Sequence, residues 1–105
     1  MQRGEVWWAR LPAPAGRRPV VLVSRDRAIQ VREAVTVAQV TTTVRRIPTE
    51  VPLGSAEGLS RPCVVNCDVL STIPKSLLQE KLGLLGPSKR VELNEALKFA
   101  LGLDR

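Results

Sequence analysis

The sequence predicts a mainly β (α+β) fold: a small, partly open β-barrel with short helices and a C-terminal helix. Short segments rich in valine, leucine, isoleucine and threonine recur through residues 5–73 and are separated by prolines and glycines, a pattern typical of strands and turns. One longer helical pattern follows near the end of the sequence. The 105 residues are 44% apolar but include only three aromatic residues. We therefore expect a single domain, residues 1–105, with an aliphatic core.

Six segments are candidate strands because they are rich in apolar and β-branched residues, which favour a pleated, half-buried surface. The longest, residues 34–44, consists mostly of valine, threonine and alanine. The first is followed by residues 12–16, where two prolines and a glycine break any strand ladder. The candidate strands are residues 5–11, 20–23, 34–44, 49–53, 62–67 and, as a further strand or a sheet edge, 69–73.

Helical patterns are confined to the last third of the chain. Residues 75–81 form a possible short helix that ends near Gly83, and residues 82–85 form a possible short strand. Ser88 is a plausible N-cap for a final helix over residues 89–101. Four apolar residues of this segment recur at helical spacing: Leu93, Ala96, Leu97 and Ala100.

Several absences narrow the chemistry. The chain contains no histidine, so the usual general base, the usual zinc ligand and every serine–histidine or cysteine–histidine arrangement are missing. Cys63 and Cys67 lie about 13 Å apart if the segment is extended, too far for a disulfide, and we expect buried free thiols. No phosphate-binding glycine motif is present. We expect no metal site and no cofactor. No apolar run reaches membrane-spanning length, so we expect a soluble, cytoplasmic protein without membrane contact.

Positive charge is concentrated in the first half of the sequence. The formal net charge is +6, and residues 1–50 hold nine arginines, no lysine and four acidic residues. Arginine suits bidentate phosphate contacts and base stacking, so nucleic acid is the expected partner. A solvated surface in an arginine-rich chain is the alternative interpretation. The predicted phosphate-binding groove contains six arginines: Arg17, Arg18, Arg25, Arg27, Arg45 and Arg46.

Two adjacent tryptophans, Trp7 and Trp8, lie on the first candidate strand and must point to opposite faces of the sheet. We expect one in the core. The other is a stacking platform for a nucleic-acid base or part of a subunit interface. We favour the interface, because tryptophan is enriched there.

Several stretches, taken together in their order and spacing, resemble the MazF/PemK family of toxin endoribonucleases. They are residues 3–8 (RGEVWW), 18–23 (RPVVLV), 40–43 (VTTT), 48–51 (PTEV), 67–73 (CDVLSTI) and 97–103 (LKFALGL). The resemblance implies an SH3-like barrel that acts as a homodimer and cuts single-stranded RNA at short motifs. It also implies a cognate antitoxin whose C-terminal segment occupies the RNA groove, with operator DNA bound only through the antitoxin complex.

The same resemblance assigns candidate site residues. The essential arginine of the family's Arg-Pro-Val motif falls on Arg18, and its active-site threonine falls on residues 41–43, with Thr41 as first choice. Asp68 matches the aspartate of an Arg-Cys-Asp motif found in part of the family, whereas Asn66 stands in place of its arginine. The loop at 12–17 is shorter than in many members. Further residues are expected to contact RNA: Arg17, Ser24, Arg25, Thr43, Arg45 and Arg46.

These residues suit RNA cleavage, because RNA supplies its own nucleophile, the 2′-hydroxyl. We expect Arg18 to stabilise the transition state and to donate a proton to the leaving group, with Thr41 as a further donor. Asp68 is a candidate base or orienting residue, or a simple turn cap. Without the resemblance, the threonine run would indicate only β-propensity. The alternative functions are a non-catalytic nucleic-acid-binding barrel and an adaptor for an acidic peptide.

Overall fold

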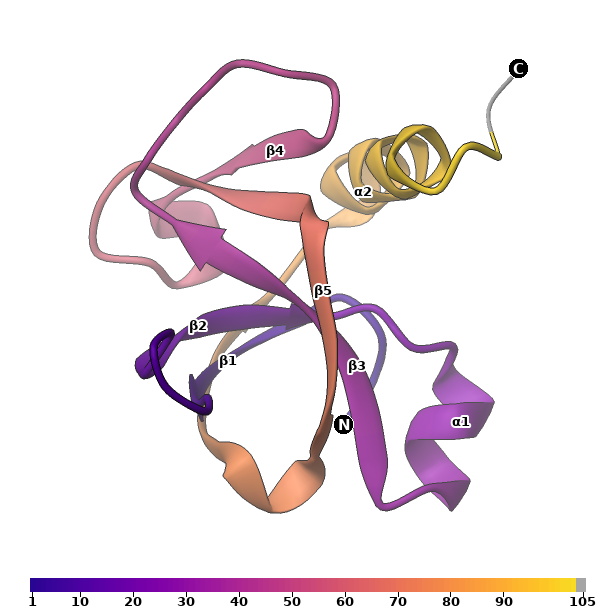
Figure 1. The fold of residues 1–105 in the computed structure, drawn as a ribbon. Coiled ribbons are helices and arrows are strands. Elements are labelled where there is room, and N and C mark those ends of the chain that lie inside the picture. Colours follow the sequence, from indigo (N-terminus) through magenta and orange to yellow (C-terminus); the bar gives the residue numbers. More distant parts are fainter. Residues whose placement is uncertain (104–105) are drawn as a thin grey trace.

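The computed structural model describes residues 1–103 and confirms the predicted fold class. Its core element is a six-stranded antiparallel sheet that curls into a half-barrel (Figure 1). The strands are β1 (Glu5–Arg10), β2 (Arg17–Leu22), β3 (Ala34–Thr41), β4 (Glu50–Leu53), β5 (Cys63–Pro74) and β6 (Leu78–Leu84). The helices are α1 (Asp26–Val31) and α2 (Pro87–Ala100), with short 3-10 turns η1 (Ser55–Glu57) and η2 (Lys75–Leu77). In the sheet the strands follow the order β4-β5-β3-β2-β1-β6.

The core is aliphatic, as predicted, and divides into two clusters. Successive residues of β2 alternate between them: Val21 belongs to one cluster and Val20 to the other. Helix α2 covers the first cluster with Leu93, which is fully buried, and α1 contributes Ile29 to the second. Core residues therefore cover both faces of one curled sheet. The buried residues of the two clusters include no aromatic side chain.

Strand β5 serves both parts of the sheet because it bends. Its register with β3 shifts between Ala38, which lies opposite Leu70, and Gln39, which lies opposite Asn66. The extra residues form a bulge, and Figure 1 shows the corner that results. The two strands predicted at 62–67 and 69–73 are therefore one bent strand.

Three local predictions are wrong. The helix predicted at 75–81 is a single 3-10 turn followed by β6, because these residues pair with β1 and this pairing outweighs local propensity. The long strand predicted at 34–44 stops at Thr41. The last helix is capped by Gly86 rather than Ser88, since Pro87 occupies its first turn. Helix α1 was not predicted, because only two of its six residues, Ala28 and Ile29, are buried.

A close backbone contact joins the two ends of the sheet. Gly58 has a φ of +86°, and a Cβ at this position would lie 2.0 Å from the carbonyl oxygen of Leu82 on β6. Only glycine fits both the left-handed backbone and this approach. The contact holds the η1 segment against β6. It thereby fixes the position from which residues 59–61 continue.

The two cysteines are in the state that the sequence predicts. Cys63 and Cys67 are buried free thiols, as expected. Burial raises the pKa of Cys67 to about 11, and the nearby Asp68 carboxylate adds to this rise. Across residues 1–103, no helix has the length and apolarity needed to cross a membrane.

Candidate functional site

Arg18 and Thr41 lie at the same end of two neighbouring strands. The β2–β3 ladder ends with Val20 opposite Gln39, and Arg18 and Thr41 each lie two residues beyond this last pair. Both residues are half-buried. The Nε of Arg18 donates a hydrogen bond to the carbonyl oxygen of Ala15 at 3.3 Å, which ties the guanidinium to the loop between β1 and β2. Two residues far apart in sequence thus lie at the same end of neighbouring strands.

A cleft of about 440 Å³ opens at this strand end. Thr41 and Thr42 line it, whereas Arg18 and Asp68 do not. Because side chains alternate along β2, Arg18 and the cleft-lining Pro19 point to opposite faces of the sheet. The full lining is Trp8, Pro19, Val40, Thr41, Thr42, Gly58, Leu59, Ser60, Arg61, Cys63 and Leu82.

The exposed Arg17 adds positive charge to the strand end that holds Arg18 and Thr41. Its guanidinium lies 4.2 Å from the centre of the Trp8 ring, a cation–π contact. Its Nε also donates a hydrogen bond to Oε1 of Gln79 on the neighbouring β6, at 2.9 Å. Arg17 therefore has a defined position over Trp8, although it is exposed to solvent.

The loop between β3 and β4, residues 42–49, is held by a carboxylate. Oε1 of Glu50 accepts hydrogen bonds from the backbone N–H groups of Arg45, at 2.9 Å, and Arg46, at 3.0 Å. Thr41 contributes a further bond, because its Oγ1 accepts the N–H of Thr43 at 3.1 Å. Arg46 adopts a left-handed backbone, with φ of 57°. Both arginine side chains are exposed, so this loop presents them to solvent beside the cleft end of β3.

Asp68 is held away from the cleft by short polar contacts. The hydroxyl of Thr49 donates to Oδ2 of Asp68 at 2.7 Å, and the Asp68 N–H donates to Oδ1 of Asn66 at 2.9 Å. Asn66, which stands in place of the arginine in the family's Arg-Cys-Asp motif, is buried. Its side-chain oxygen accepts this hydrogen bond within the bulge of β5. Asp68 thus joins β5 to the start of β4.

The structure separates the six arginines of the predicted groove into two groups. Oγ of Ser24 accepts the N–H of Thr36 at 2.8 Å, so Ser24 and the adjacent Arg25 lie beside the start of β3. Thr36 is five residues from Thr41, about 16 Å along a strand. Figure 1 shows α1, which begins next to Arg25, at the opposite end of β3 from its arrowhead. Arg25 and Arg27 therefore do not join Arg17, Arg18, Arg45 and Arg46.

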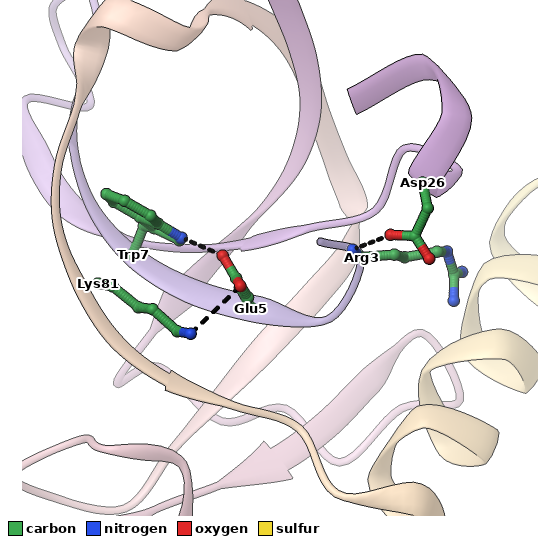
Figure 2. Close-up of polar contacts among 5 residues, drawn as sticks. All are labelled: Arg3, Glu5, Trp7, Asp26 and Lys81. Atoms are coloured by element: carbon green, nitrogen blue, oxygen red, sulfur yellow. Dashed lines mark hydrogen bonds and ion pairs between the residues drawn. The ribbon is translucent and has the colours of Figure 1, made fainter. Parts of the chain in front are cut away.

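Trp7 and Trp8 point to opposite faces, as predicted. Trp7 packs against the second core cluster, and its Nε1 donates a hydrogen bond to Oε1 of Glu5 at 2.8 Å. Figure 2 shows that the other carboxylate oxygen of Glu5 meets Nζ of Lys81 on β6, at 3.2 Å. Burial opposes the charge of Glu5, but these two partners outweigh it and lower the pKa of the carboxyl. The buried carboxylate thereby fixes β1 against β6.

Figure 2 also shows how the N-terminal segment is attached. The backbone N–H of Arg3 donates to Oδ1 of Asp26 at 2.6 Å, and its Nε donates to the carbonyl oxygen of Val23. Neither this contact nor the Glu5 network was apparent from the sequence, because each joins residues from different elements. Within residues 1–103, no group of three histidine, cysteine or acidic side chains is placed to hold a metal ion.

Sequence reasoning did not single out Ser60 and Arg61, which line the cleft. The available signal was weak: Arg61 is the one basic residue between positions 47 and 74, in a stretch of glycine, serine and proline. Their position depends on the contact of Gly58 with Leu82, which no local pattern predicts.

A curled antiparallel sheet with an arginine and a threonine at one strand end, in a strongly basic chain, defines a small basic β-barrel. Residues 2–101 match the family described as PemK-like, MazF-like toxin of type II toxin-antitoxin system, and the chain belongs to this family.

Individual relatives agree with this assignment. The chain is 42% identical over 87 residues to endoribonuclease MazF3 of Mycobacterium tuberculosis. These matched residues cover 83% of this chain and 84% of that protein. The solved M. tuberculosis toxin MazF-mt6 superposes with a TM-score of 0.88 at 39% identity, covering 96% and 99% of the two chains. A mycobacterial endoribonuclease solved in complex with its cognate antitoxin also gives 0.88, at 32% identity, covering 100% and 98%.

Proposed function

We propose that this chain is an endoribonuclease toxin that cuts single-stranded RNA at short sequence motifs. The observation that carries the proposal is the placement of Arg18 and Thr41 at the same end of neighbouring strands, where a cleft opens beside Thr41. The endoribonuclease names of its relatives support the reaction class.

The proposed reaction uses the nucleophile of the RNA itself. The 2′-oxygen attacks the adjacent phosphorus and releases its proton to water, the P–O5′ bond breaks, and the 5′-oxygen takes up a proton from Arg18. The products are a 2′,3′-cyclic phosphate and a 5′-hydroxyl end. No metal ion is needed in this scheme, because no water or protein side chain has to be activated as the nucleophile.

The protein's part is to place the phosphate and stabilise the charge of the transition state. An arginine guanidinium holds its proton tightly, so Arg18 does not act as a base. It acts as an electrostatic stabiliser, and the proton that it donates to the 5′-oxygen is replaced from water. The Thr41 hydroxyl donates a second hydrogen bond to the phosphate. A well-placed donor of this kind contributes about 3–4 kcal/mol. Asp68, bound to Thr49, acts as an orienting residue that joins β4 to the bulge of β5.

The RNA strand is proposed to follow the arginines of this end, with Arg17 on β2 and Arg45 and Arg46 on the loop after β3. The Thr43 backbone, bound to Thr41, keeps that loop against the strand end. Ser24 and Arg25 lie at the far end of β3 and contact RNA only if the strand continues across the sheet.

We propose two protein partners. One is a cognate antitoxin that covers the RNA groove, as the antitoxin complex of the mycobacterial neighbour suggests; operator DNA is bound only through that complex. The other is a second copy of this chain. The exposed apolar residues of the α2 region support a homodimer, because they form an unpartnered surface: Val91, Phe99, Leu101 and Leu103.

The proposal is tested by replacing Arg18 with lysine, which keeps the charge but removes the planar fork. Cleavage of a long single-stranded RNA should fall by at least about a hundredfold, with an unchanged circular dichroism spectrum. Arg32→Lys on the exposed end of α1 is the matched control and should cut normally. Full activity in Arg18→Lys contradicts the assigned role.

A further inference from the structure

Trp8 borders the cleft with a large aromatic surface that the cleavage scheme does not use. Its partners across the cleft are apolar, with Pro19 from β2 and Leu59 from the segment after η1. The polar lining consists only of donors or hydroxyls: Thr41, Thr42, Ser60 and Arg61. None of the described residues that line the cleft is acidic. A largely apolar cleft with hydroxyl groups and one arginine in its lining matches a nucleobase better than it matches a lipid chain.

Trp8 contacts an arginine side chain and also lines the cleft. In the ladder Trp8 lies opposite Pro19, so Trp8, Pro19 and Arg17 share one face of the sheet. Arg17 lies over the ring at 4.2 Å, yet it is not among the residues that line the cleft. The guanidinium therefore lies against one face of the indole, and Trp8 itself lines the cleft. An indole that is held by a cation at the edge of an apolar cleft is suited to stacking a base.

We propose that this cleft binds one unpaired base of the RNA strand, stacked on Trp8, next to the phosphate held at Thr41. The inference rests on the proposed function and adds a base-recognition site to it. The cleft volume, about 440 Å³, lies within the range of roughly 300–1,000 Å³ that small-ligand sites occupy. Thr41 lines the same cleft, so a base bound there is adjacent to the reacting phosphate.

Arg61 defines the kind of base edge that the cleft recognises. A guanidinium offers only donors, so the edge next to Arg61 presents acceptors, such as the O6 and N7 of guanine or the carbonyl oxygens of uracil. The Ser60 and Thr42 hydroxyls can donate or accept, and they select among such edges. Arg61 is exposed and makes no ion pair within residues 1–103, so it is available for this contact.

The chain has two tryptophans, which permits a direct test. Trp7→Phe leaves Trp8 as the only indole fluorophore, and Trp8→Phe leaves Trp7, which faces the core. Each protein is titrated with 2′-O-methyl RNA homopolymers of the four bases, which lack the nucleophile. We expect saturable quenching in the Trp8-only protein by one or more of them, and none in the Trp7-only protein. An abasic strand with the same phosphates should not quench Trp8.

Cleavage kinetics provide the second readout. Loss of stacking in Trp8→Ala should weaken substrate binding by about 5- to 150-fold. This loss should appear in KM with kcat retained, because the base is bound equally in the ground state and the transition state. Trp8→Phe should keep most of the affinity. Arg61→Ala, at an exposed position, should change which motifs are cut without affecting the folded spectrum.

The outcomes separate this inference from the function on which it rests. RNA cleavage with unquenched Trp8 and an unchanged KM in Trp8→Ala and Arg61→Ala would overturn the base site and leave the endoribonuclease assignment standing. Quenching of Trp8 by base-bearing strands without any cleavage would support the base site and refute the nuclease. Equal quenching by the abasic strand would show that Trp8 responds to phosphate alone, and it would overturn the inference.

Discussion

Gly58→Ala is the substitution whose effect follows most directly from the geometry. The new Cβ would lie 2.0 Å from the Leu82 carbonyl oxygen and 2.6 Å from its carbon, both backbone atoms that cannot rotate away. The residue would also have to keep a left-handed φ of +86°. Such a backbone costs about 1–2 kcal/mol for an L-residue, and overpacking costs about 1–3 kcal/mol. We expect a loss of at least about 2 kcal/mol in the free energy of unfolding.

Chemical denaturation with Gly54→Ala as the matched control measures this loss. Gly54 lies four residues earlier and has nothing within 4 Å of its ideal Cβ position, so its substitution should change stability little. For a domain of this size, the expected loss in Gly58→Ala lowers Tm by roughly 8–16 °C. If both variants unfold at the wild-type midpoint, the close contact between Gly58 and β6 does not exist, and the account of how the cleft wall is fixed is wrong.

Three further predictions concern buried groups. Glu5→Gln should lower the free energy of unfolding by about 1 kcal/mol at neutral pH. Because the pKa of Glu5 is lowered in the folded protein, the difference between wild type and variant should shrink as the pH falls below about 4.3. It should vanish in unfolding curves measured at lower pH. Cys63 and Cys67 should resist a thiol reagent in the native protein and both react after unfolding in guanidinium, because burial shields them and raises both pKa values; rapid native labelling would contradict their burial. Glu50→Ala should speed hydrogen exchange at the Arg45 and Arg46 amides, whereas Glu92→Ala on the exposed side of α2 should not; equal exchange in both variants would show that Glu50 does not hold the loop.

The strands and the helix whose apolar residues recur in a clear pattern were predictable from the sequence. Strands at the start of the chain and the valine-rich β3 were evident, because their apolar residues recur in short runs between prolines and glycines. The final helix was evident from the spacing of Leu93 and Ala96. Strand β6 was predicted only at its end: residues 82–84 fall within the possible strand at 82–85, whereas residues 78–81 were assigned to a helix. The reason is that this edge strand depends on pairing with β1 rather than on its own residues.

The candidate site was predictable only in part. Arg18 and Thr41 were identified from the resemblance of short stretches, and their placement at the same end of neighbouring strands was not visible in the sequence. Arg61 and Ser60 were missed because a single glycine contact, that of Gly58, decides where they lie. Glu50 was assigned no role, since its two backbone partners belong to a loop without a pattern.

Incubation of the purified protein with a long single-stranded RNA in EDTA tests the central claim most directly, with Arg18→Ala as the control and the cut ends mapped. The account predicts cuts at a recurring short motif, 5′-hydroxyl and cyclic phosphate ends, and loss of cutting in the control. Intact RNA after incubation with folded wild-type protein, or equal cutting by the control, would contradict it.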